Sequence, residues 1–269
     1  MNDTVTKIAS HVVDWVMAIT PRQVPATAVL QSCKIISHRG EHDNTEVMEN
    51  TLRAYEIART NGVWGIETDI RWTRDLVPVV CHDVDCRRVF GNSMTVGEIS
   101  FAELRDAVPL IPSLAELIEE FGGNTHLMIE IKEEPFPQKQ QQAQILLEHL
   151  ASLTPGEDYH LLALDPSLFE LADFLPRKYC LPVAETNTRI ISKASLAGDY
   201  GGLTGHYLLL NDELKQRHEQ AGQRVGTGFV DSRNSLYREL NRGVEWIFSN
   251  NAVKLQKLLD QALAEVERS

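Results

Sequence analysis

Residues 64–70 read Trp-Gly-Ile-Glu-Thr-Asp-Ile, and a second apolar run at 77–81 ends at His82. Side chains alternate between the two faces of a strand, so Glu67 and Asp69 share one face. Two neighbouring carboxylates repel each other unless a cation or a basic group lies between them. Oxygen ligands suit Mg²⁺ or Ca²⁺ better than softer metals. The stretch therefore predicts a strand that carries part of a metal site.

Short apolar runs alternate with amphipathic stretches along most of the chain. Runs typical of strands occur at 34–37, 64–70, 77–81, 127–131, 159–164, 180–184, 207–210, 224–230 and 246–248. Helical spacing of apolar residues occurs at 51–60, 112–121, 138–151, 212–221 and 232–242. This alternation predicts an α/β fold with a parallel sheet and crossover helices. About eight units without a linker favour a single TIM-type (β/α)8 barrel over two doubly wound domains.

Two segments fall outside this alternation. Residues 85–108 contain few apolar runs, and we interpret them as a small insertion over one end of the barrel, after the second barrel segment. Residues 5–19 have helical spacing before Pro21 and Pro25, which predicts an extra N-terminal helix. We expect a helical extension over 1–30 and a barrel domain over 31–269. The extra helix would cover one barrel end; the alternative is a membrane-surface or partner helix.

The overall composition restricts the class of protein. A chain of 269 residues, 43% hydrophobic and 24% charged, can bury a full core and is ordinary for a soluble globular protein. With 26 Lys and Arg against 38 Asp and Glu, the formal net charge is −12, which would repel phosphate backbones at long range. Nucleic acid is therefore not an expected partner, and we expect a small-molecule substrate.

Cysteine usage and hydropathy bear on location. The four cysteines, at 33, 81, 86 and 180, lack CxxC spacing and suit reduced thiols. The N-terminus lacks the uninterrupted apolar core of a signal peptide, and no run of eighteen apolar residues occurs. We therefore expect a cytoplasmic protein without a transmembrane segment.

Polar residues follow four of the predicted strands, where parallel α/β folds place their chemistry. In chain order these groups are His38-Arg39-Gly40, Glu67-Thr-Asp69, His82-Asp83 and Glu130-Ile-Lys132. Each has a structural alternative: a histidine is often only hydrogen-bonded, Glu67 and Lys132 are able to form a buried ion pair, and Arg39 is able to neutralise its acidic neighbours. Seven such groups without a ligand would carry a large desolvation cost. The set therefore predicts a functional site.

A series of short motifs, taken in order, resembles the glycerophosphodiester phosphodiesterase family. The motifs are His38-Arg39-Gly40, Glu49-Asn50-Thr51, Glu67-x-Asp69, Thr73-x-Asp75, Pro78-Val-Val-x-His82-Asp83, Ile111-Pro112-Ser113-Leu114 and Glu130-Ile-Lys132. The resemblance covers about residues 35–250, and 85–108 is similar to the family's insertion. It implies a TIM-type barrel that hydrolyses glycerophosphodiesters to glycerol 3-phosphate and an alcohol, with a divalent cation.

The resemblance implies a role for each residue at the predicted mouth. Glu67, Asp69 and Glu130 match the family's metal ligands, which suit Mg²⁺ or Ca²⁺ able to polarise a phosphoryl group. His38 and His82 match its catalytic pair, and two imidazoles are able to divide the proton transfers between them, although either one could be the base.

Four further residues belong to the expected mouth or adjoin it. Arg39 and Lys132 offer a planar fork and a point charge to phosphate oxygens. Asn50 is a candidate N-cap of the helix that follows, and a role for Glu49 in the site comes from the resemblance alone.

Three places depart from the family pattern. Residues 41–45 are more polar than the usual linker, Gly228-Phe-Val-Asp231 replaces a Trp-Thr-Val-Asn stretch, and Ser249-Asn250-Asn251 replaces Thr-Asp followed by Pro. The first change concerns the cation or the entry to the site. The other two concern substrate recognition, including the family's aromatic wall, more than the phosphoryl chemistry. The alternatives are a lysophospholipase D-type or cyclising phosphodiesterase on the same barrel, and a non-catalytic glycerophosphodiester-binding protein. The alcohol group, the cation and the oligomeric state stay open.

Overall fold

A closed barrel of eight parallel strands forms the centre of the computed structural model, which describes residues 16–268. The barrel closes because β1 pairs with both β2 and β9. Its strands are β1 (Lys34–His38), β2 (Gly65–Trp72), β4 (His126–Ile131), β5 (Tyr159–Ala163), β6 (Cys180–Ala184), β7 (Gly202–His206), β8 (Arg224–Gly228) and β9 (Trp246–Ser249).

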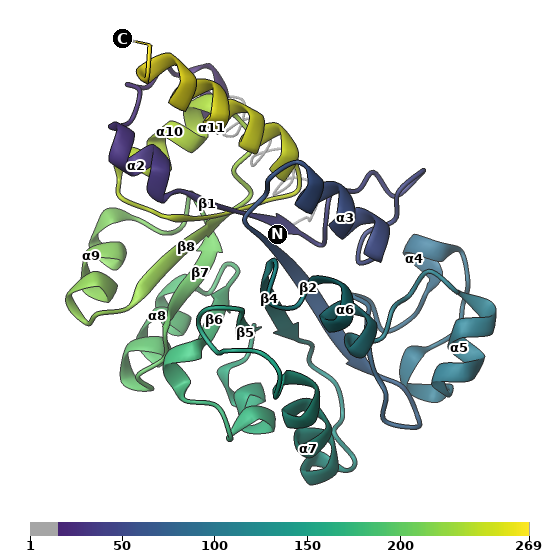
Figure 1. Ribbon diagram of the computed structural model, residues 1–269. Coiled ribbons are helices and arrows are strands. Elements are labelled where there is room, and N and C mark those ends of the chain that lie inside the picture. The colour runs from purple at the N-terminus through teal and green to yellow at the C-terminus, as the bar shows by residue number, and fades with distance from the viewer. Residues whose placement is uncertain (1–15, 269) are drawn as a thin grey trace.

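Helices cover the outside of the barrel (Figure 1). They are α3 (Leu52–Thr60), α6 (Leu114–Phe121), α7 (Lys139–Leu150), α8 (Thr188–Ala197), α9 (Asp212–Gln220), α10 (Arg233–Asn241) and α11 (Ala252–Val266), with the 3₁₀ helices η2 (Pro166–Ala172) and η3 (Arg177–Tyr179). Apolar side chains on the outer faces of the strands pack under these helices, as in Ile66, Ile129 and Leu161. The predicted TIM-type (β/α)8 barrel is confirmed.

The strand predicted at 207–210 is wrong, because β7 lies earlier, at Gly202–His206. Its first residue pairs with Arg224 so closely that a Cβ on Gly202 would lie 2.0 Å from the Arg224 carbonyl oxygen. Glycine therefore suits this pairing, although it gives no strand signal in the sequence. Tyr207 and Leu210 are buried in the turn that leads to α9, which explains the apolar run.

The run at 77–81 is extended, but it is not a barrel strand as predicted. Strand β3 (Pro78–Val80) pairs antiparallel with the end of β2, with Ile70 opposite Val80. The connection is a tight turn in which the Leu76 amide donates to the Thr73 carbonyl at 3.0 Å. A turn this short permits only an antiparallel hairpin, since a parallel pair needs a long crossover.

Residues 85–108 form a separate small cluster beside the barrel, seen at α4 and α5 in Figure 1. They contain α4 (Arg87–Phe90), the 3₁₀ helix η1 (Val96–Glu98) and α5 (Phe101–Ala107). Cys86, Val96 and Leu104 pack there against residues of the β3 region. A capping box between Ser100 and Glu103 starts α5.

Most of the N-terminal helix predicted at 5–19 lies outside the described residues. Residues 16–19 are helical, and α2 (Thr27–Ser32) packs against α10 and α11. Side-chain amides hold this segment to the barrel domain: Asn234 donates to the Ala18 carbonyl at 2.6 Å and Asn241 to the Gln23 carbonyl at 2.9 Å. The division into an extension over 1–30 and a barrel over 31–269 stays a prediction. No helix within residues 16–268 has the length and hydropathy to cross a bilayer.

Two buried histidines close the floor of the barrel, at the amino ends of its strands. His126 Nε2 and His160 Nδ1 lie 2.8 Å apart, and Trp64 stacks on His126 at 4.3 Å between ring centroids. Burial lowers the pKa of His126 to about 4 and that of His160 to about 3. Both rings are therefore neutral at physiological pH.

We expect this pair to make folding stability depend on pH below neutrality. Each histidine has an ordinary pKa of 6.5 when unfolded, so the unfolded chain binds more protons between pH 6.5 and the folded pKa. The contribution of the neutral pair to the free energy of unfolding is fully present above about pH 6.5. It is lost as the pH falls towards 4, by about 1.4 kcal/mol per pH unit for each additional proton that the unfolded chain binds. Urea unfolding at several pH values measures the slope. His160→Phe should make it shallower by about one proton, and an unchanged slope would contradict the assignment.

Candidate active site

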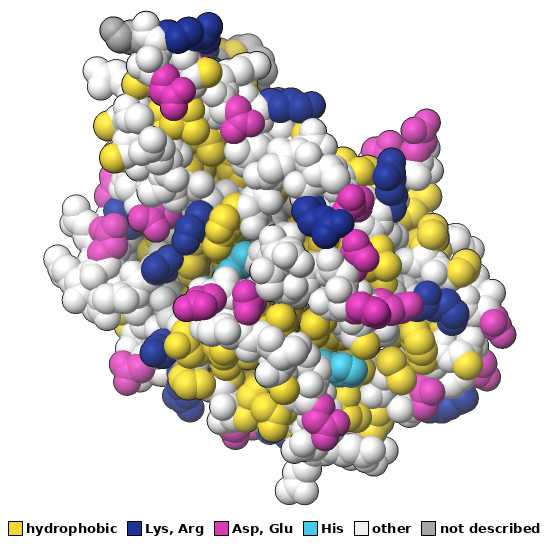
Figure 2. All heavy atoms as spheres, viewed as in Figure 1, with side chains coloured by type: hydrophobic (Ala, Val, Ile, Leu, Met, Phe, Trp, Pro, Cys, Tyr) yellow, Lys and Arg dark blue, Asp and Glu magenta, His cyan; other side chains and the backbone are white. Residues whose placement is uncertain are grey.

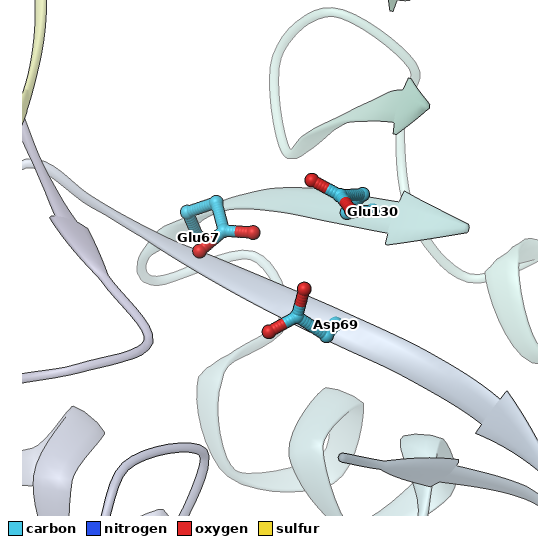
Figure 3. Close-up of side chains that lie close together, drawn as sticks. All are labelled: Glu67, Asp69 and Glu130. Atoms are coloured by element: carbon cyan, nitrogen blue, oxygen red, sulfur yellow. The ribbon is translucent and has the colours of Figure 1, made fainter. Parts of the chain in front are cut away.

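Three carboxylates meet between two neighbouring strands at the mouth of the barrel. Glu67 and Asp69 lie on β2, and Glu130 lies directly opposite Asp69 on β4. Each offers one oxygen within 4.8 Å of the others, and their residues are only 2%, 1% and 9% exposed. Figure 3 shows the three side chains pointing toward one another. The predicted pair on one strand face is thus joined by the third predicted carboxylate.

This grouping is electrostatically costly without a cation. Burial raises the pKa of Glu67 well above its ordinary value, and the charges of Asp69 and Glu130 raise it further. Burial also raises the pKa of Glu130. Asp69 differs: burial opposes its ionisation, but Lys132 and Arg39 outweigh that effect and lower its pKa. A buried set of carboxylate oxygens in this state fits a hard divalent cation.

Arg39 and Lys132 lie on the two sides of the carboxylate cluster. Lys132 follows β4, and its Nζ lies 2.6 Å from Glu130 Oε1 and 3.4 Å from Asp69 Oδ1. Arg39 Nε lies 3.3 Å from Asp69 Oδ2, and its Nη1 donates to Glu49 at 3.0 Å. Both predicted phosphate-binding residues are therefore partly neutralised by acidic neighbours while facing the same cavity.

His38, at the end of β1, is held by Asn250, which follows the neighbouring strand β9. Its Nδ1 lies 2.6 Å from Asn250 Oδ1, and its Nε2 lies 3.7 Å from Glu67 Oε2. A carbonyl oxygen only accepts, so Nδ1 carries the proton and Nε2 faces the carboxylates unprotonated. Burial lowers the pKa of His38 to about 4, which favours this neutral ring.

His82 reaches the same cavity from the loop after β3, not from the carboxyl end of a barrel strand as predicted. The Cys81 amide donates to the Asp69 carbonyl at 3.0 Å, which fixes this loop against β2. His82 Nδ1 lies 2.6 Å from Asp83 Oδ1. Burial lowers the pKa of His82, although Asp69 opposes that effect.

The cavity that these residues share has a volume of about 310 Å³. Six of the seven predicted site residues line it, and Asp69 lies beneath them. Apolar side chains such as Leu164, Leu209 and Phe229 also line it, together with the polar residues Glu185 and His206. Phe229 is 51% exposed and has a φ of 68°, a rare conformation for a bulky residue outside a tight turn.

Phe229 supplies an aromatic ring at the place where the expected tryptophan is absent. Its ring stacks on His206 at 5.2 Å and approaches His38 edge-on at 6.0 Å. His38 therefore has polar neighbours in Asn250 and Glu67 and an aromatic neighbour in Phe229.

Sequence reasoning missed Arg88, which links the insertion to the mouth. Its guanidinium donates to both oxygens of Glu49, at 2.7 and 2.9 Å, and to Asp83 Oδ2 at 2.6 Å. Arg88 thereby holds Glu49, which binds Arg39, and Asp83, which binds His82. The only local signal was an arginine five residues after Asp83, and nothing in the sequence indicates the contact with Glu49.

Asn50 also has a role that differs from the prediction. The N-cap of α3 is Thr51, whose side chain accepts from the Ala54 amide. Asn50 instead takes a φ of 56° and donates its side-chain amide to Asp69 at 2.8 Å. This hydrogen bond stabilises the ionised form of Asp69.

The polar residues 41–45 support Glu49 and add no ligand to the cluster. Asp43 Oδ1 accepts from three successive backbone amides, which shapes the loop as a tight turn. Asn44 then donates to Glu49 Oε2 at 2.7 Å. The departure from the family pattern at residues 41–45 therefore changes the hydrogen-bond partners of Glu49 and leaves the three carboxylates as they are.

The sequence model of the glycerophosphoryl diester phosphodiesterase family matches residues 38–173, about half of the chain. The chain therefore belongs to this family. It is 34% identical over 117 residues to glycerophosphodiester phosphodiesterase 1 of Rattus norvegicus, covering 36% of this chain and 34% of that protein. It is 34% identical over 110 residues to a glycerophosphodiester phosphodiesterase of Caldanaerobacter subterraneus, covering 36% of this chain and 44% of that protein. The match spans about a third to under half of the length of these relatives.

Two solved structures show the same fold. A putative glycerophosphodiester phosphodiesterase from Galdieria sulphuraria superposes with a TM-score of 0.71 at 24% identity, over 85% of this chain and 98% of that one. An Oleispira antarctica phosphodiesterase, in complex with the product sn-glycerol-3-phosphate, also gives 0.71 at 20% identity, over 84% and 96% of the chains.

We expect Mg²⁺ or Ca²⁺ to raise the melting temperature, because a cation would offset repulsion among the three carboxylates. Glu67→Gln should abolish that shift and also raise the melting temperature without metal, by about 2–4 °C for each kcal/mol of repulsion removed. Glu185→Gln, the same change at an exposed position of the mouth, is the control. Differential scanning fluorimetry with and without a chelator measures both effects. An ion-induced shift that survives Glu67→Gln would place the cation elsewhere.

Proposed function

We propose that this protein is a metal-dependent phosphodiesterase that hydrolyses glycerophosphodiesters to glycerol 3-phosphate and an alcohol. The observation that carries the proposal is the single cavity in which a three-carboxylate cluster faces two histidines held through Nδ1. The relatives named for this activity support it, although each is matched over a minority of its length.

In this proposal, Glu67, Asp69 and Glu130 hold a divalent cation, Mg²⁺ or Ca²⁺. When bound, it would neutralise charge on the phosphate and polarise the phosphoryl group. Arg39 and Lys132 orient the diester by binding non-bridging oxygens, with the guanidinium as a planar fork and the ammonium as a point charge. Their contacts with Asp69 and Glu130 keep both groups in place before substrate arrives.

His38 and His82 divide the proton transfers. Each ring has Nδ1 engaged, by Asn250 and by Asp83, which leaves Nε2 for the reaction. One imidazole accepts the proton of the attacking oxygen and the other donates a proton to the leaving oxygen. Attack by water gives a linear product, whereas attack by the glycerol hydroxyl gives a cyclic phosphate.

The apolar side chains of the cavity favour one alternative substrate class. Leu164, Leu209 and Phe229 line the same cavity as the polar ligands and would accept an alkyl or acyl group. The chain also shares 38% identity over 69 residues with a lysophospholipase D of Mus musculus, covering 26% of this chain and 21% of that protein. Lysophospholipids are therefore the second candidate, beside deacylated head-group diesters. The presence of both histidines at the cavity argues against the alternative of a non-catalytic glycerophosphodiester-binding protein.

The class of substrate and the cellular location are also proposals. On the face shown in Figure 2, Lys and Arg side chains are interspersed with Asp and Glu, and no extended patch of one sign is seen. The formal net charge of −12 supports a small-molecule substrate over nucleic acid, and a cytoplasmic location stays a prediction.

A coupled assay for glycerol 3-phosphate tests the reaction. We expect glycerol 3-phosphate from glycerophosphocholine or glycerophosphoethanolamine, and from lysophospholipids an acylated glycerol 3-phosphate with the free head-group alcohol, which mass spectrometry detects. Activity should require Mg²⁺, Ca²⁺ or Mn²⁺, disappear with a chelator and recover when the cation returns. Mass spectrometry distinguishes linear from cyclic products. Full activity after exhaustive chelation would remove the metal from the proposal, and binding of substrate without turnover would leave only the binding-protein alternative.

His38→Ala and His82→Ala should each lower kcat by roughly 10²–10⁴-fold, as expected for loss of a general acid or base. Their side chains are 25% and 29% exposed at the mouth, so the melting temperature should change little. His149→Ala, on α7 outside the barrel, is the matched control. Wild-type turnover in either mouth variant would show that its imidazole is not an acid or base.

A further inference from the structure

A second cavity, of about 400 Å³, lies at the floor of the barrel. It opens among the amino ends of β5, β8 and β9, the end opposite to the mouth, and none of its lining residues lines the mouth cavity. Six side chains give it its chemical character: His160, Lys178, Tyr179, Asp199, Arg224 and Trp246.

The floor cavity contains a hydrogen-bond acceptor, His160 Nε2, whose protonation state follows from the hydrogen bonds of the neighbouring ring nitrogens. His126 Nδ1 lies 2.7 Å from the Glu157 carbonyl, which only accepts, so this nitrogen carries the proton. His126 Nε2 is then unprotonated and accepts from His160 Nδ1 at 2.8 Å. Since both rings are neutral, His160 Nε2 keeps a lone pair, for which residues 16–268 offer no partner.

Two cations border the same cavity without a carboxylate partner. The Arg224 guanidinium lies over Trp246 at 5.2 Å, and Lys178 Nζ lies over Tyr179 at 4.9 Å. Neither forms an ion pair within the described part of the chain. The buried indole nitrogen of Trp246 likewise has no hydrogen-bond partner there. In a chain with a formal net charge of −12, this is a local surplus of positive charge and free donors.

We propose that the floor cavity binds a phosphate monoester of a small polyol. The phosphate lies against Arg224 and Lys178, which supply a fork and a point charge. A hydroxyl of the polyol donates to His160 Nε2, and the Asp199 carboxylate is a second acceptor in the lining. Sulfate, which carries no hydroxyl at neutral pH, would satisfy the two cations and leave His160 without a donor. The site does not depend on the proposed reaction at the mouth.

The indole N–H resonance of Trp246 reports on this cavity, because Trp246 lines the floor and not the mouth. Its assignment follows from Trp246→Phe among the four tryptophans. We expect a saturable shift when sn-glycerol 3-phosphate is added at constant ionic strength with a chelator. Arg224→Gln should weaken binding about tenfold, the usual effect of losing about 1.4 kcal/mol from one charge-assisted contact. Arg189→Gln, the same substitution at an exposed position of α8, should bind like the wild type.

His160→Phe separates the hydroxyl contact from the phosphate contact. The variant keeps an aromatic ring but has no acceptor, so it should bind sn-glycerol 3-phosphate no more tightly than sulfate. The wild type should prefer the polyol ester. The proposal is overturned by a Trp246 resonance that stays fixed up to on the order of 10 mM ligand, or by wild-type affinity in Arg224→Gln. Because Arg224 is exposed, its substitution tests the phosphate contact even if His160→Phe does not fold.

Discussion

Three buried carboxylates on two paired strands are the constraint on which the mouth of this barrel depends. The pairing of Asp69 with Glu130 places them together before any side chain adjusts, so their repulsion is imposed by the backbone. The neighbours of the cluster act to compensate it: Lys132 contacts two of the carboxylates, and Asn50 donates to Asp69. The remaining excess of negative charge is what a divalent cation would neutralise.

Orientation of the two histidines depends on residues from distant parts of the chain. Asn250 follows the last strand and holds His38, whereas Asp83 holds His82 and is itself bound by Arg88 of the insertion. Arg88 also binds Glu49, the partner of Arg39. The insertion is therefore part of the structure that fixes the mouth, since one guanidinium connects both its acid/base and its phosphate-binding sides.

Regular alternation of apolar runs predicted the barrel because each strand is covered on both faces and each crossover needs an amphipathic helix. The prediction failed where other physics outweighed propensity. Strand β7 begins at Gly202, where close pairing with Arg224 leaves no room for a side chain, and β3 turns back on β2 through a connection too short for a crossover. Asn50 was expected to cap a helix by its residue type, yet Asp69 lies within reach of its amide and takes that hydrogen bond.

The sequence by itself determined the barrel class and brought the seven candidate residues to one mouth, because strand periodicity places Glu67 with Asp69 and Glu130 with Lys132 on a common face. Only the tertiary structure decided which partners complete those residues. The contacts of His38 with Asn250 and of Arg88 with Glu49 join positions 212 and 39 residues apart, and the histidine pair at the floor joins positions 34 apart. Such contacts follow from barrel closure and loop packing, which no local pattern of residues specifies.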